Sequence, residues 1–123
     1  MIEPAIPNIS KAQDLLVFIY DAFNRRDIEP ILAVMDPNVE WPNGMEGGWI
    51  HEREQVRTYW LRQWKVVDPQ VTPVRFERDE KDRIVVHVKQ LVRDLNGAIL
   101  FDRMVRHIYT IKGDLISRMD IQE

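Results

Sequence analysis

The chain has 123 residues, of which 45% are hydrophobic and 30% are charged, and its formal net charge is −3. This composition is typical of one soluble globular domain, and the negative charge argues against nucleic acid as a partner. The sequence contains no cysteine, which excludes disulfides and thiolate metal sites. No apolar run is long enough for a membrane span and the first residues lack the regions of a signal peptide, so we expect a cytoplasmic protein.

The first predicted helix begins after a proline-containing segment. Residues 1–9 are expected to form an extended lead-in, and Ser10 with Gln13 then matches a capping box, which is a signal for a helix start. The apolar residues that follow recur at helical spacing and predict one buried stripe. The stripe consists of Leu15, Leu16, Ile19, Tyr20 and Phe23.

Two further helices and two strands are predicted before the C-terminal third of the chain. The third helix carries an unusual number of aromatic side chains, and a glycine-rich loop precedes it. Pro73 lies within a predicted strand and should therefore occupy a sheet edge or a bulge. The predicted ranges are 27–35 and 51–65 for the helices, 38–41 and 70–78 for the strands, and 42–48 for the loop.

Residues 84–122 predict three antiparallel strands joined by two tight turns. Asn96-Gly97 lies between two apolar runs, which is the pattern of a two-residue type I′ hairpin turn. Such a turn would pair Leu95 with Ala98, and counting back from this pair sets the register. The pairs that would then share one face are Val92 with Phe101, Gln90 with Arg103, Val88 with Val105, Val86 with His107, and Ile84 with Tyr109.

The second turn contains the last glycine of the chain and leaves two registers open. In one of them His107 lies opposite Arg118, and in the other it lies opposite Asp120. Both registers place these residues on one face with Gln90 and Arg103. The other face of the last strand is more apolar, however, and if that face points inward Asp120 is exposed instead.

Helices followed by a mainly antiparallel sheet of about four strands predict an α+β fold, with a pocket between the sheet and its helical cover.

The segments FNRRDIEPILAVMDPNVEW and GDLISRMDIQE resemble the nuclear transport factor 2-like superfamily, most closely its SnoaL-like and ketosteroid isomerase-like proteins. The resemblance covers nearly the whole chain. It implies a single SnoaL-like domain over residues 1–123, with a cone-shaped fold in which three N-terminal helices pack on a strongly bent sheet. It also implies a homodimer.

The resemblance further suggests site residues. The position of the ketosteroid isomerase base corresponds to Trp41, which cannot take a proton from carbon. The oxyanion-hole positions fall on or next to His107 and one residue before Tyr20. SnoaL-type cyclases and limonene-type epoxide hydrolases carry an acid seven residues after the turn glycine, which corresponds to Asp120. The other epoxide hydrolase partners have no counterpart here.

We therefore expect His107 and Asp120 to form an acid–base pair, because a carboxylate orients a histidine, and histidine titrates near neutral pH. The alternative is that the polar residues of this face form a structural ion-pair network. The expected ligand-binding residues are Arg118, Arg103, Gln90, Trp41, Tyr20 and Tyr59.

Two functions remain open. The first is a small-molecule-binding protein that acts as a cofactor-independent isomerase or cyclase on an apolar, carbonyl-bearing ligand, without a metal. The alternative is a non-catalytic ligand carrier or dimerising domain of the same fold, which Trp41 at the base position favours. The three histidines are too scattered to predict a metal site.

Overall fold

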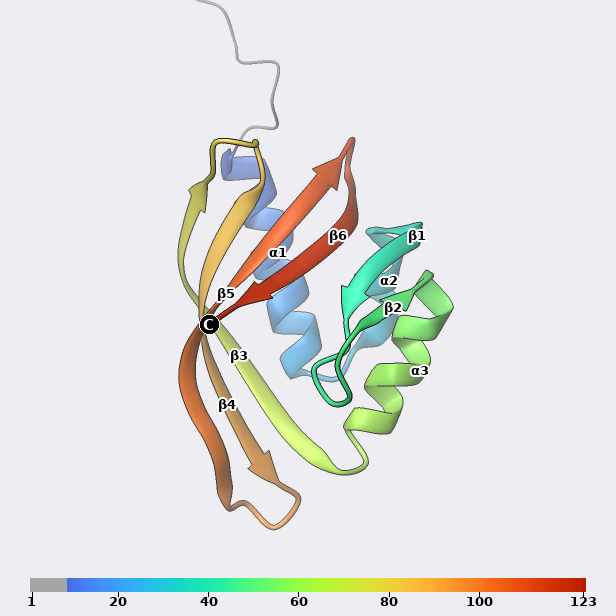
Figure 1. The fold of residues 1–123 in the computed structure, drawn as a ribbon, viewed down its shortest axis with the longest axis vertical. Coiled ribbons are helices and arrows are strands. Elements are labelled where there is room, and N and C mark those ends of the chain that lie inside the picture. Colours follow the sequence, from blue (N-terminus) through green and yellow to red (C-terminus); the bar gives the residue numbers. More distant parts are fainter. Residues whose placement is uncertain (1–8) are drawn as a thin grey trace, which may run out of the picture.

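The computed structural model describes residues 9–123 (Figure 1). The predicted extended lead-in lies outside the described residues except for Ile9, which already belongs to the first helix. The helices are α1 (Ile9–Asn24), α2 (Ile28–Ala33) and α3 (Arg53–Gln63). The strands are β1 (Met35–Pro42), β2 (Trp49–His51), β3 (Val67–Arg78), β4 (Ile84–Asp94), β5 (Ile99–Lys112) and β6 (Leu115–Gln122).

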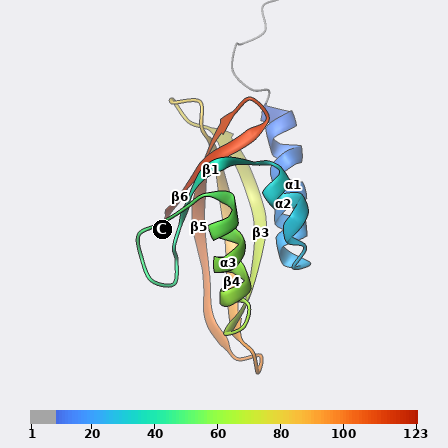
Figure 2. The same cartoon turned by 90° about the vertical axis from the view of Figure 1, so that its right-hand side faces the viewer.

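The strands form one sheet in the order β2-β1-β6-β5-β4-β3. β1 runs parallel to β6, and every other neighbouring pair of this sheet is antiparallel. The long strands are strongly bent, and α1 and α3 lie within their curve (Figures 1 and 2). The predicted α+β class and the cover of three helices are confirmed, whereas the sheet has six strands rather than about four.

Tertiary pairing moves several predicted boundaries. Met35, predicted to end a helix, is the first residue of β1 because it pairs with Ile116 of β6. His51, predicted to begin a helix, is the last residue of β2. α3 begins only after Glu52, whose positive φ of 76° turns the backbone between the strand and the helix. Pro73 lies in the edge strand β3 next to a register shift, as its sequence context predicted.

The first hairpin keeps the predicted register but reaches it through a different turn. All five predicted pairs between β4 and β5 are observed. The loop has three residues rather than two, because the Asp94 carboxylate accepts hydrogen bonds from the backbone N–H groups of Asn96 and Ala98. Gly97 adopts the left-handed conformation, with φ 94°, and Leu100 is an extra residue on β5 that restores the register.

The second hairpin does not follow either predicted register. Lys112 pairs with Leu115, as in the register that would place His107 opposite Asp120. A bulge at Ser117 then inserts one residue into β6. The Ser117 hydroxyl donates to the carbonyl of Thr110 at this bulge, at 3.1 Å. A shift by one residue turns every later side chain to the other face. His107 therefore lies opposite Ile121, and the expected pairing of His107 with Arg118 or Asp120 is wrong.

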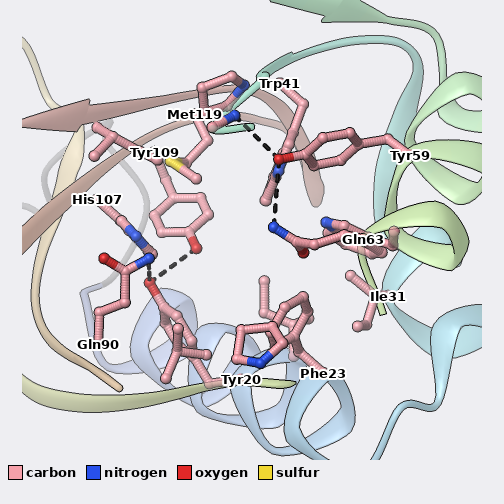
Figure 3. A pocket seen from close by; sticks show the side chains of 17 residues that line it. Tyr20, Phe23, Ile31, Trp41, Tyr59, Gln63, Gln90, His107, Tyr109 and Met119 are labelled. Atoms are coloured by element: carbon pink, nitrogen blue, oxygen red, sulfur yellow. Dashed lines mark hydrogen bonds between the residues drawn. The ribbon is translucent and has the colours of Figure 1, made fainter. Parts of the chain in front are cut away.

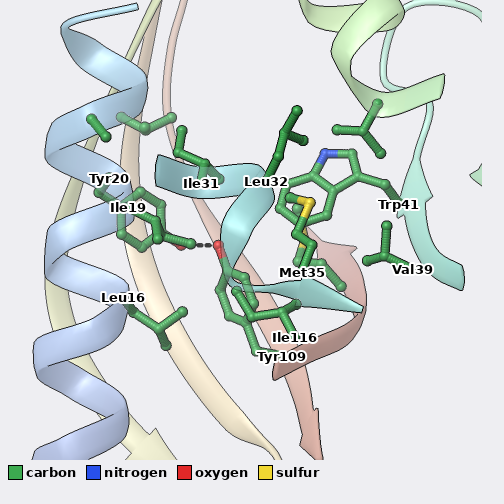
Figure 4. Close-up of a cluster of buried hydrophobic side chains, with 14 of the residues drawn as sticks. Leu16, Ile19, Tyr20, Ile31, Leu32, Met35, Val39, Trp41, Tyr109 and Ile116 are labelled. Atoms are coloured by element: carbon green, nitrogen blue, oxygen red, sulfur yellow. Dashed lines mark hydrogen bonds between the residues drawn. The ribbon is translucent and has the colours of Figure 1, made fainter. Parts of the chain in front are cut away.

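The core lies between the inner face of the sheet and the helices (Figure 4). Its largest fully buried side chains come from every layer of the fold. They are Leu16 of α1, Ile31 and Leu32 of α2, Met35 and Val39 of β1, Val56 of α3, Ile84, Val86 and Val88 of β4, Tyr109 of β5, and Ile116 of β6. Packing of these residues holds α1 against the sheet, where its closest strand is β3.

Asn24 joins the end of α1 to β3. Its side chain donates to the Val71 carbonyl at 2.7 Å and accepts from the Val71 N–H at 2.9 Å. We expect Asn24→Ala to lower the free energy of unfolding by about 2 kcal/mol, because both backbone groups of a buried residue lose their partner. Urea denaturation measures this loss. The control is Asp21→Ala, which removes an exposed ion pair with Arg25 and should cost under about 0.5 kcal/mol. Equal losses would contradict the role of Asn24.

Candidate functional site

A cavity of about 110 Å³ lies between the inner face of the sheet, α1 and α3 (Figure 3). Among the described residues, its lining contains no Asp, Glu, Lys or Arg. The lining consists of Ile19, Tyr20, Phe23, Ile31, Trp41, Pro42, Gly44, Tyr59, Trp60, Gln63, Pro69, Val71, Gln90, His107, Tyr109, Met119 and Ile121. A group that enters this cavity therefore meets aromatic and aliphatic surface and a few neutral polar atoms.

Aromatic side chains from α3, β1 and β5 form one wall. The Trp41 ring meets the Trp60 ring edge to face, with centroids 5.5 Å apart, and lies 6.3 Å from Tyr109. Tyr59 closes this side, because its hydroxyl accepts a hydrogen bond from the Gly44 N–H at 3.0 Å. Burial raises the pKa of Tyr59, which remains a neutral phenol at pH 7. These contacts hold rigid, flat surfaces on one side of the cavity.

Tyr109 also belongs to a hydrogen-bonded chain of three side chains. The Tyr109 hydroxyl donates to the Tyr20 hydroxyl at 2.9 Å, and the Tyr20 oxygen lies 2.8 Å from His107 Nδ1. Tyr109 and His107 are two residues apart on β5 and so point to the same face, while Tyr20 reaches them from α1. Figure 3 shows the three groups converging next to Gln90.

Burial determines the protonation of this chain. It lowers the pKa of His107 to about 4, so the imidazole is neutral at pH 7. Burial also raises the pKa of Tyr20 and of Tyr109, which keeps both phenols protonated. When the Tyr20 hydroxyl donates to Nδ1, the single proton of the neutral imidazole lies on Nε2. Within residues 9–123 Nε2 has no hydrogen-bond partner, which leaves it available to a group in the cavity.

Five of the expected site residues line the cavity and three do not. The five are Tyr20, Trp41, Tyr59, Gln90 and His107. Asp120 lies on the other face of the sheet, where Arg118 donates to its carboxylate at 3.0 Å. Arg118 also lies 3.6 Å from Glu40 and 4.2 Å above the Trp49 ring. The structure therefore brings Arg118 and Asp120 together but separates both from His107.

Arg103 shares the inner face with His107 but lies outside the lining. Its Nε donates to Gln90 Oε1 at 3.1 Å, and its guanidinium forms an ion pair with Glu123. The side chain is thus one contact removed from the cavity.

Tyr109 is one of the cavity residues that are not among the site residues expected from the sequence. Its position two residues after His107 was the available signal, since this spacing places both side chains on one face.

Residues 9–123 were expected to hold no metal site and no membrane span. No group of three or more His, Asp or Glu side chains there is placed to hold a metal ion. None of the helices in this range is long and apolar enough to cross a membrane.

A model of the SnoaL-like domain matches residues 18–119. The chain belongs to the SnoaL-like domain family. The resemblance predicted from the sequence is thereby confirmed, and with it the nuclear transport factor 2-like fold. No curated protein sequence matches this SnoaL-like protein.

Solved structures show the same fold. TerC, crystallised with polyporic acid, is 28% identical, with a TM-score of 0.76 over 88% of this chain and 87% of TerC. A nuclear transport factor 2-like protein of unknown function from Burkholderia pseudomallei is 24% identical, with a TM-score of 0.77 over 89% of this chain and 88% of its own. A candidate polyketide cyclase from Xanthomonas campestris pv. campestris is 18% identical, with a TM-score of 0.79 over 94% and 91% of the two chains.

Proposed function

We propose that this SnoaL-like protein binds a small, flat molecule whose inserted part is uncharged and carries a carbonyl or a similar hydrogen-bond acceptor. The observation that carries the proposal is the cavity lining, which combines aromatic walls with the unpartnered Nε2 of His107 and lacks charged side chains among the described residues. A formal charge inside such a cavity would be desolvated without a counter-ion, which is costly. A neutral ring with one acceptor matches the aromatic walls and the N–H of His107.

The size of the cavity limits the inserted part. A cavity of about 110 Å³ accommodates roughly one aromatic ring, since cavities of about 150 Å³ bind benzene. Trp41, Trp60 and Tyr109 offer ring surfaces, and neutral His107 offers an N–H donor. The co-crystallisation of TerC with polyporic acid supports an organic ligand for this protein.

The cavity supports binding better than proton abstraction from carbon. A general base works best when its pKa lies near the working pH, and burial holds the pKa of His107 at about 4. The Asp120 carboxylate, the expected partner of His107, is paired with Arg118 on the other face. A cofactor-independent isomerisation or cyclisation is the second candidate, favoured by the Tyr109–Tyr20–His107 chain, in which the N–H of His107 would hydrogen-bond the ketone oxygen. Deuterium incorporation from solvent into the methyl group of acetophenone tests it.

We expect ring-sized ketones to bind more tightly than the matching hydrocarbons. Acetophenone should bind about fivefold to tenfold more tightly than ethylbenzene, because one hydrogen bond to His107 contributes about 1 kcal/mol. Quenching of the fluorescence of Trp41 and Trp60, both in the cavity wall, measures the affinities. His107→Phe should remove the preference for the ketone while keeping a flat ring at this position.

The matched control is His87→Phe. His87 lies on the other face of β4, where its imidazole contacts Glu77 and Arg75, so this variant should keep the ketone preference. Circular dichroism verifies that both variants fold. A ketone preference that survives His107→Phe, or the absence of binding by any ring-sized probe, would overturn the proposal.

A further inference from the structure

Arg103 lies next to the cavity lining, on the part of β5 that β6 no longer covers. β6 ends at Gln122, which pairs with Arg106, so the segment of β5 that carries Arg103 extends past the last strand. Figure 1 shows the β4–β5 hairpin continuing beyond the end of β6. Arg103 shares the inner face of β5 with His107 and donates to the side chain of Gln90, which lines the cavity. The guanidinium is therefore connected to the cavity wall by one hydrogen bond.

The Arg103 guanidinium is oriented by Phe101 and Gln90, and its anionic partner is an exposed carboxylate. Its carbon atom lies 5.1 Å above the centroid of the Phe101 ring, and Gln90 orients Nε. Its carboxylate partner is Glu123, and the side chains of the two residues are 45% and 67% exposed. Ion pairs this exposed contribute little to stability, so an incoming anion can replace Glu123 at low cost. A planar guanidinium offers two parallel donors to a carboxylate.

We propose that Arg103 is a carboxylate-binding subsite at the mouth of the cavity and that the ligand is an aromatic carboxylate. The inference rests on the proposed function: the uncharged ring and its acceptor occupy the cavity, and the acid group lies outside on Arg103. A ligand of this kind explains two observations together. The described cavity lining has no charged side chain, and a guanidinium lies directly next to it, on Gln90.

The register sets the length of such a ligand. Arg103 and His107 are four residues apart on β5, which corresponds to about 13 Å along a strand. A molecule of two linked rings, with the acceptor at one end and the carboxylate at the other, covers this distance. The outer ring would lie against Phe101 and Ile121, which are about half exposed on this face, at 51% and 40%.

The test uses two probes that differ in one group. One probe is acetylbiphenyl, and the other is the acetylbiphenyl carboxylate whose acetyl and acid groups lie at opposite ends of the two rings. We expect the carboxylate to bind the wild-type protein about tenfold more tightly at low salt, and added salt to reduce this ratio. Arg103→Gln should remove the ratio, whereas Glu123→Gln should raise the affinity for the carboxylate by freeing Arg103. Arg106→Gln, on the opposite face of the same strand, should leave the ratio unchanged.

The outcomes separate this proposal from the one on which it depends. Binding of both probes with equal affinity, or a carboxylate preference that survives Arg103→Gln, would overturn the subsite and leave the proposed function intact. If neither probe binds the wild-type protein but acetophenone does, the subsite is overturned and the proposed function stands. If acetophenone also fails to bind, both proposals fail. A preference that disappears in Arg103→Gln and remains in Arg106→Gln supports the subsite.

Discussion

Acidification from pH 7 to pH 4 is expected to cost the wild-type protein about 3 kcal/mol more free energy of unfolding than it costs the His107→Gln variant. Burial lowers the pKa of His107 from 6.5 to about 4 in the folded protein. Between these values the unfolded chain binds a proton that the folded chain does not bind, so stability falls as the pH decreases. The free energy of unfolding falls by about 1.4 kcal/mol per pH unit over the roughly 2.5 pH units between the two pKa values.

Urea denaturation at several pH values between 4 and 8 measures this difference, because the titration of all other groups is common to both proteins. Tyr109→Phe is the control. It removes a cavity hydroxyl that donates to Tyr20 and not to His107, so His107 remains buried and the steep dependence should persist. Parallel curves for the wild-type protein and His107→Gln would show that His107 is not desolvated in the folded protein. Above pH 7 the two proteins should differ by a constant amount.

Trp41→Ala is expected to lower the free energy of unfolding by about 3–5 kcal/mol, which is the range for truncation of a buried tryptophan. The Trp41 side chain is only 8% exposed and packs between Trp60 and Tyr109. Its loss would merge the vacated volume with the existing cavity. The variant should therefore bind two-ring ketones more tightly relative to one-ring ketones than the wild-type protein does. Urea denaturation measures the first effect, and ligand-induced thermal shifts measure the second.

Trp49→Ala provides the comparison for the same residue type. Trp49 is 40% exposed and contacts Arg118 on the other face of the sheet, so its truncation should cost no more than about 1 kcal/mol. It should leave the relative affinities for one-ring and two-ring ketones unchanged. Similar losses of stability in the two variants would mean that Trp41 does not form part of the packed wall.

The two proposals assign different tasks to the inner and outer ends of one face of β5. In these proposals His107 binds an uncharged acceptor inside the cavity, and Arg103 binds an acid group beside it. Both side chains were expected on this face from the register of the first hairpin, and this register is confirmed. The third expected group, Asp120, lies on the other face and pairs with Arg118.

The sequence by itself determined the parts of the structure that depend on local signals. The register of the β4–β5 hairpin follows from alternating side chains and a glycine that accepts a positive φ, so the inner face with Gln90, Arg103 and His107 could be predicted. The aromatic walls were predictable as well, because Tyr20, Trp41 and Tyr59 lie in apolar helical or strand patterns. The family resemblance predicted the fold.

Only the tertiary structure decided which side of β6 faces the cavity. The bulge at Ser117 lies between the two points where β6 pairs with β1, at Ile116 and Arg118, and the pairing with β1 also changes register there. A bulge that depends on two neighbouring strands leaves no local mark in the sequence, yet it turns Met119 and Ile121 inward and Asp120 outward. The same long-range packing brings Tyr20 of α1 onto His107, 87 residues away, and its burial determines the charge of that histidine.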